Sequence, residues 1–156
     1  MNIFSIYFEK IRKFLIDLEK DKQIKLSDNL NKLTIELPPK DLQGDISCNA
    51  ALVLSKINNK KPKDIAILLK TNLIKKFPEF KNIFIAEPGF LNIEFNEDFW
   101  QKFLNDLLNL KEKYGSNSSK KNKYNVEFVS ANPTGPLHVG HCRGAILGDV
   151  ITKLLI

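Results

Sequence analysis

The chain contains 156 residues, of which 43% are hydrophobic and 27% are charged, a balance typical of folded globular proteins rather than of disordered segments. The net charge of +6 is compatible with a polyanionic partner, but a lysine-rich composition produces the same charge without any binding role. No apolar stretch approaches the roughly 18 residues that would span a membrane, the N-terminus lacks a secretory signal, and two cysteines are too few for a disulfide framework or a metal site. We therefore expect a cytoplasmic protein with no membrane association and no bound metal of its own.

The first part of the chain predicts a helix, a strand and a loop. Apolar residues recur at helical spacing between Asn2 and Glu19, which indicates an amphipathic helix. Apolar and polar residues alternate over residues 33–37, which predicts a short strand that ends at Pro38-Pro39. Residues 41–45 are mostly polar and include a glycine, so we expect a loop there.

The middle of the chain predicts two helices, two strands and a further helix. The apolar spacing is helical over residues 46–57, and a proline at position 62 is well placed to begin a helix through Lys76. Residues 83–85 and 90–95 resemble two strands that meet at a Pro-Gly turn, and a last helix follows over 99–110. These elements predict an α+β domain with helices packed on a small antiparallel sheet.

A change in composition divides the chain into two parts. We expect the first domain to cover residues 1–115 and a polar linker without apolar periodicity to cover 116–123. The remainder, 124–156, reads as a strand over 124–129, a loop with two prolines, and a helix over 139–155. Strand, turn and helix form the beginning of a Rossmann-type α/β domain, which a single strand and helix cannot complete.

Both histidines of the chain, His138 and His141, lie three residues apart at this junction. The simpler interpretation is a pair of polar residues that cap the helix. The functional interpretation is a phosphate site, because a helix N-terminus offers free N–H groups and a partial positive charge. Gly140 would let the backbone approach a base or ribose, and the two imidazoles could donate to the same phosphate oxygens.

The segment from Val126 to Gly144 reads VEFVSANPTGPLHVGHCRG and closely resembles the signature of bacterial arginyl-tRNA synthetases. The His-Val-Gly-His motif alone would indicate only class I synthetases and related nucleotidylyltransferases. Upstream, Gly44-Asp45 and the segment from Pro88 to Ile93 are similar to the N-terminal additional domain of that family.

The resemblance implies an arginine–tRNA ligase that uses ATP, accompanied by Mg²⁺, to activate L-arginine and transfer it to tRNA(Arg). His138 and His141 would be catalytic and would bind ATP together with Gly140, and the arginine pocket would contain Glu127, Ser130 and Asn132. From the residues alone, Glu127 fits an exposed strand position equally well. Some family members carry a lysine shortly before the first histidine, whereas this chain has Gly135, so another cation would have to contact the triphosphate.

The resemblance also implies that the N-terminal domain reads a D-loop nucleotide of the tRNA through Phe90 and Asn92. These residues are two apart and would share one face of a strand, as a stacking ring beside an amide that can read a base edge. The alternative is a core phenylalanine and a polar residue at a strand end. Lysines at positions 56, 60, 61 and 63 would add phosphate contacts or simply form a solvated face.

Three functions remain open at this point. The first is an arginine–tRNA ligase present as an N-terminal fragment, expected to be monomeric and inactive by itself because most of the catalytic fold is missing. The second is a free-standing module that binds the tRNA elbow without catalysis. The third is a nucleotidylyltransferase acting on a small cofactor precursor, which is disfavoured because about 120 residues of another domain lie upstream of the segment that carries the His-Val-Gly-His motif.

Overall fold

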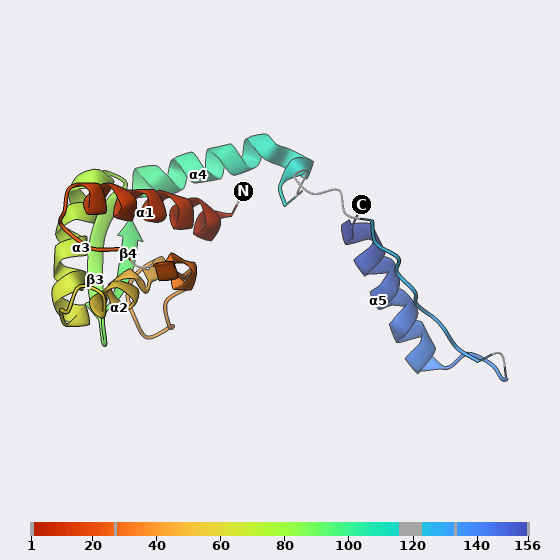
Figure 1. Ribbon diagram of the computed structural model, residues 1–156. Helices are drawn as coiled ribbons and strands as arrows, with labels where there is room; N and C mark the ends of the chain where they lie inside the picture. Colours follow the sequence, from red (N-terminus) through yellow and green to blue (C-terminus); the bar gives the residue numbers. More distant parts are fainter. Residues whose placement is uncertain (1, 27, 116–122, 133, 156) are drawn as a thin grey trace. The chain divides into compact units, whose positions relative to one another are not determined.

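The computed structural model describes residues 2–26, 28–115, 123–132 and 134–155, and it separates into two units, Met1–Gly115 and Ser116–Ile156. Figure 1 shows the elements of both. The first unit contains, in chain order, α1 (Ile3–Lys20), the 3-10 helix η1 (Asp28–Lys32), β1 (Ile35–Glu36), β2 (Ile46–Cys48), α2 (Ala50–Ser55), α3 (Pro62–Lys76), β3 (Phe80–Ala86), β4 (Phe90–Phe95), α4 (Glu97–Leu110) and the 3-10 helix η2 (Lys111–Lys113). The second contains α5 (Val139–Leu155).

The four strands form one antiparallel sheet in the order β1-β2-β4-β3. The register places Ile93 of β4 opposite both Ile46 of β2 and Ile83 of β3, and all three side chains are fully buried. Because side chains alternate across a strand, these residues define one face of the sheet, which packs against apolar residues of α1, α2 and α3. The opposite face carries Phe90 and Asn92. Neither residue belongs to the hydrophobic core that the helices cover.

The structure confirms the predicted α+β architecture and corrects one element. The sequence placed α1, α3, β4 and α4 correctly. Helix α3 begins at the predicted first-turn proline, Pro62. The predicted helix over residues 46–57 is wrong at its start, because residues 46–48 form β2 and the helix covers only Ala50–Ser55. The strand has only three residues, Ile46–Cys48, and its apolar residues also fit the helical spacing that continues into α2, so the sequence did not distinguish strand from helix there.

A cluster of aromatic rings joins α1 and α4 to the sheet. The ring of Tyr7, which is 1% exposed, lies 4.7 Å from that of Phe95 and 5.9 Å from that of Phe99, measured between centroids. The ring of Phe99 stacks on Phe95 at 4.1 Å. Beyond this point α4 buries no side chain fully, and Leu104 and Leu108 are exposed. The first turn of α4 is therefore the part of that helix held by the core.

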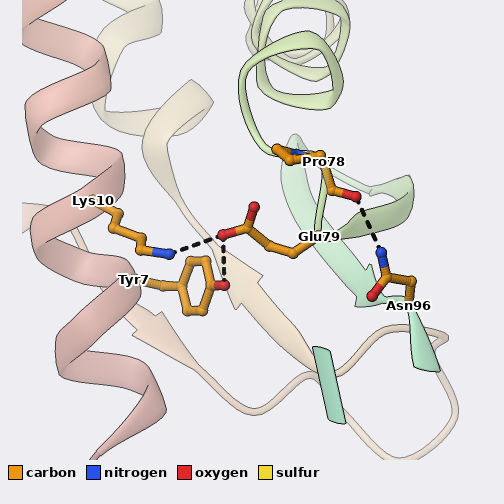
Figure 2. A network of polar contacts seen from close by, with 5 residues as sticks. All are labelled: Tyr7, Lys10, Pro78, Glu79 and Asn96. Carbon is orange, nitrogen blue, oxygen red and sulfur yellow. Dashed lines mark hydrogen bonds and ion pairs between the residues drawn. The ribbon is translucent and has the colours of Figure 1, made fainter. Parts of the chain in front are cut away.

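A polar network lies at the edge of this cluster (Figure 2). The Tyr7 hydroxyl donates to the Glu79 carboxylate at 3.0 Å, and the Lys10 ammonium donates to the same oxygen at 2.8 Å. Asn96 connects the network to α4, because its side-chain amide donates to the Pro78 carbonyl at 3.1 Å and its side-chain oxygen caps the helix at Phe99. The network thus links α1, the start of β3 and the start of α4.

We expect the unfolding free energy of the chain to fall in acid because of Glu79. Burial raises the pKa of Glu79, but hydrogen bonds from Lys10, its own backbone and Tyr7 outweigh burial and leave that pKa below its usual value. A carboxyl with a lowered pKa in the folded state stabilises that state above its unfolded pKa, and the stabilisation is lost as pH falls through the folded pKa.

Urea unfolding measured between about pH 6 and about pH 3 tests this expectation. The variant Glu79→Gln should show a shallower decline in stability than the wild type. Equal pH dependence in wild type and Glu79→Gln would contradict the assignment.

The second unit consists of α5 and the segment that precedes it. The helix covers the predicted residues 139–155. The predicted strand over 124–129 is wrong, because residues 123–132 run alongside the helix without forming a strand (Figure 1). A strand is stabilised by hydrogen bonds to a neighbouring strand, and the described part of this unit contains none. Gly148 packs closely on the Phe128 ring, since a Cβ there would lie 2.2 Å from it, whereas the space around Gly144 is open. Among the described residues no helix combines the length and apolarity needed to cross a membrane.

Candidate functional site

A cavity of about 330 Å³ lies on the sheet face that no helix covers. Its walls combine the loop between β1 and β2, the turn between β3 and β4, and the strands themselves. The lining residues are Glu36, Leu37, Pro38, Pro39, Leu42, Ser47, Ala86, Glu87, Phe90 and Asn92. The cavity therefore contains both residues expected to contact tRNA, together with apolar side chains suited to a flat ring.

Asn92 forms the most deeply buried part of this cavity. The side chain is 1% exposed, and its Oδ1 atom has no hydrogen-bond partner. A buried polar atom without a partner is costly, and such atoms in native proteins often mark the place of a ligand or water. Phe90 is half-buried on the same face and is not a core residue. Asn92 lies inside β4 rather than at its end. The two residues therefore do not have the positions that the alternative interpretation gave them.

The loop before β2 holds Asn92 in place. Gly44 has φ +122°, and a Cβ at this position would lie 2.9 Å from the Asn92 Cβ. The next residue, Asp45, fastens the loop to β4 at two points: its N–H donates to the Ile93 carbonyl at 2.8 Å, and its carboxylate accepts from the Phe95 N–H at 2.8 Å. Gly44 and Asp45, which the sequence singled out only by resemblance, thus form a wall behind the amide of Asn92.

Basic residues adjoin the cavity at the N-terminus of α3. Lys63 pairs with the cavity residue Glu87 at 4.0 Å, and Gly89 packs so closely on Pro62 that a Cβ would lie 2.7 Å from its ring. The lysines at positions 56, 60, 61 and 63 are all exposed. Of these lysines, Lys63 is the one that the contacts place beside the cavity, where it is paired with Glu87.

The histidine pair lies at the start of α5, where the sequence places it. The rings of His138 and His141 have centroids 3.9 Å apart. The His138 N–H donates to His141 Nδ1 at 3.1 Å, and the Gly140 N–H donates to His138 Nδ1 at 3.1 Å. Because both Nδ1 atoms accept, a neutral ring at either position carries its proton on Nε2, which can act as a donor. This arrangement suits phosphate oxygens.

Gly140 has a steric role that spacing did not reveal. A Cβ on Gly140 would lie 2.9 Å from the His138 ring, so only a glycine leaves room for that ring to fold over the first turn of the helix. The following Cys142 and Arg143 are exposed, and Arg143 makes no ion pair with the described residues.

Two of the three residues expected to bind arginine are brought together. Ser130 donates a short hydrogen bond to the Glu127 carboxylate, across a turn in which Val129 has φ +59°. A β-branched residue rarely adopts this conformation, which stores strain at the turn. Asn132 is exposed, and its side chain contacts neither residue through a hydrogen bond.

Ser47 is a cavity residue that sequence reasoning missed. It is 4% exposed and lies directly opposite Asn92 in the β2–β4 register. The only sequence signal was a hydroxyl between two apolar residues, Ile46 and Cys48, which is uninformative when the segment is expected to be a helix. Recognising β2 would have placed Ser47 on the cavity face.

Comparisons with known proteins agree over nearly the whole chain. Residues 7–95 match the family described as arginyl tRNA synthetase N terminal domain, and residues 103–156 match tRNA synthetases class I (R), catalytic domain. The chain is 48% identical over 157 aligned residues to an arginine–tRNA ligase of Pelagibacter ubique, covering 100% of this chain and 27% of that protein. An arginine–tRNA ligase of Brucella anthropi is 39% identical, with 99% of this chain and 26% of that protein covered.

A solved structure supports the fold. The arginyl-tRNA synthetase of Plasmodium falciparum superposes with a TM-score of 0.63 at 21% identity, covering 99% of this chain and 30% of that one. The chain spans about a quarter of the length of the curated relatives it matches. The chain belongs to the arginyl-tRNA synthetase family, of which it contains the N-terminal domain and the first part of the class I catalytic domain.

Proposed function

We propose that the chain is the amino-terminal part of an arginine–tRNA ligase, in which residues 1–115 hold tRNA(Arg) and residues 124–156 begin the site for ATP and L-arginine. Residues 116–123, of which only Lys123 is described, would be the linker. The observation that carries the tRNA role is the cavity in which Phe90 stands beside the unpartnered amide of Asn92. A single unstacked base fits this combination, since its ring can stack on Phe90 while its edge bonds to Asn92.

In the second unit the proposed reaction is the attack of the arginine carboxylate on the α-phosphate of ATP, with release of pyrophosphate. Mg²⁺ bound to ATP would neutralise phosphate charge. The Nε2–H groups of His138 and His141 would donate to phosphate oxygens as negative charge develops on them. The Glu127 carboxylate, oriented by Ser130, suits the α-ammonium of arginine, and Asn132 would complete that pocket.

The tRNA role predicts that Phe90→Ala and Asn92→Ala weaken binding. Each variant should raise the Kd for a tRNA(Arg) transcript by about 5- to 100-fold, because stacking on one aromatic ring contributes about 1–3 kcal/mol per base. Fluorescence anisotropy with the 156-residue chain measures the Kd. Tyr114→Ala and Asn105→Ala, at exposed positions of the same unit, are matched controls that should bind like the wild type.

Unchanged Kd values for both Phe90→Ala and Asn92→Ala would rule out the cavity as the base site. The alternative function, a tRNA-elbow-binding module without catalysis, predicts the same losses. Reading the source DNA past the codon for Ile156 separates the two: continuation into the remaining catalytic and anticodon-binding domains supports the ligase, and a stop codon supports the module.

A further inference from the structure

Two buried polar side chains lie side by side on the uncovered face of the sheet. Ser47 and Asn92 are the only polar residues of the described chain that are buried, at 4% and 1% exposure. The β2–β4 register places them directly opposite each other, which brings their Cβ atoms to within about 5 Å. Buried polar side chains almost always have hydrogen-bond partners. Two adjacent ones on a sheet face that no helix covers therefore indicate a partner outside the sheet.

Neither side chain satisfies its hydrogen-bonding capacity within the described protein. Asn92 Oδ1 has no partner, and the Ser47 hydroxyl bonds to no described side chain or backbone group. The Ser47 hydroxyl is not among the fully buried atoms that lack a partner, so it reaches the cavity rather than a closed interior. Both residues line the cavity that Phe90 flanks.

We propose that Ser47 is a further base-binding residue of this cavity, in which its hydroxyl and the Asn92 amide together bond the edge of the base that stacks on Phe90. This inference rests on the proposed tRNA role of the cavity. A hydroxyl both donates and accepts, and an amide carries one donor group and one acceptor, so the pair complements a base edge that presents a donor beside an acceptor. Every standard nucleobase offers such an edge once it is unpaired.

The test measures Ser47→Ala in the 156-residue chain against a series of tRNA(Arg) transcripts, each with one abasic D-loop position. On the intact transcript we expect Ser47→Ala to raise Kd about 3- to 10-fold, the range for one neutral hydrogen bond. On the abasic transcript that weakens wild-type binding most, Ser47→Ala should bind like the wild type, because the contacted edge is missing. Ser5→Ala, exposed on α1, is the matched control and should change nothing.

A merely structural serine gives a different pattern. Its removal would lower the melting temperature and weaken binding to intact and abasic transcripts alike, and that result overturns the inference, as does unchanged Kd on the intact transcript. Loss of binding in Phe90→Ala and Asn92→Ala together with normal binding by Ser47→Ala would refute the role of Ser47 alone. Normal binding by all three variants would refute the proposed base site as well.

Discussion

Replacing Tyr7 by alanine should lower the free energy of unfolding of the first unit by about 3–5 kcal/mol, the range for deleting a large buried aromatic side chain. The ring is 1% exposed and contacts Phe80, Phe95 and Phe99 at centroid distances of 4.7–5.9 Å. Its removal would leave a cavity where α1, the sheet and the first turn of α4 meet. Urea unfolding monitored by the fluorescence of Trp100, whose ring lies 5.7 Å from that of Phe95, measures the loss.

The variant Tyr7→Phe separates the ring from the hydroxyl. It keeps the aromatic contacts and removes only the 3.0 Å hydrogen bond to Glu79, which retains its bond to Lys10. The expected loss is about 1–2 kcal/mol, because the acceptor is charged but remains paired. Burial, followed by the bond to Glu79, raises the pKa of Tyr7, so the hydroxyl remains a donor throughout the neutral range. Equal losses in both variants would show that the ring contributes nothing beyond its hydroxyl, contrary to the packing described.

The sequence predicts elements whose signals are local. Pro62 occupies the first turn of α3, and alternate residues of β4 face the core, so both elements were predictable from short windows. The helix of the second unit and its histidine pair were predictable for the same reason. The strand β2 was not, because its three residues are too few to separate a period of two from the helical spacing that continues into α2.

The cavity is formed by residues far apart in the sequence, and local sequence patterns do not predict which strands will pair. β2 lies beside β4 although about forty residues separate them, and this crossover brings Ser47 next to Asn92. Phe90 and Asn92 were predictable by resemblance to the family, whereas Ser47 required the register of the sheet. Likewise, the spacing of His138, Gly140 and His141 indicated a phosphate site, but the room that Gly140 leaves for the His138 ring became visible only in three dimensions.

The variant Gly44→Ala should lower stability and, through the proposed base site, the affinity for tRNA(Arg), because this position combines an unusual backbone conformation with a close contact. Its φ of +122° is strained for any residue with a Cβ, and the added Cβ would lie 2.9 Å from the Asn92 Cβ and 3.2 Å from the Asn92 backbone. Neither neighbour is the flexible end of a side chain, so the loop or β4 must shift. Strain and overpacking together are expected to cost about 2–5 kcal/mol.

Gly115→Ala provides the matched control for Gly44→Ala, because Gly115 also has a positive φ, +85°, but no atom within 4 Å of its Cβ position. It measures the backbone cost of a positive φ without a steric clash, expected at about 1–2 kcal/mol. If the wall formed by Gly44 positions Asn92, tRNA(Arg) affinity should fall in Gly44→Ala at least as far as in Asn92→Ala and stay unchanged in Gly115→Ala. Normal tRNA affinity in a folded Gly44→Ala variant would contradict the role of Gly44 in positioning Asn92 for the proposed base contact.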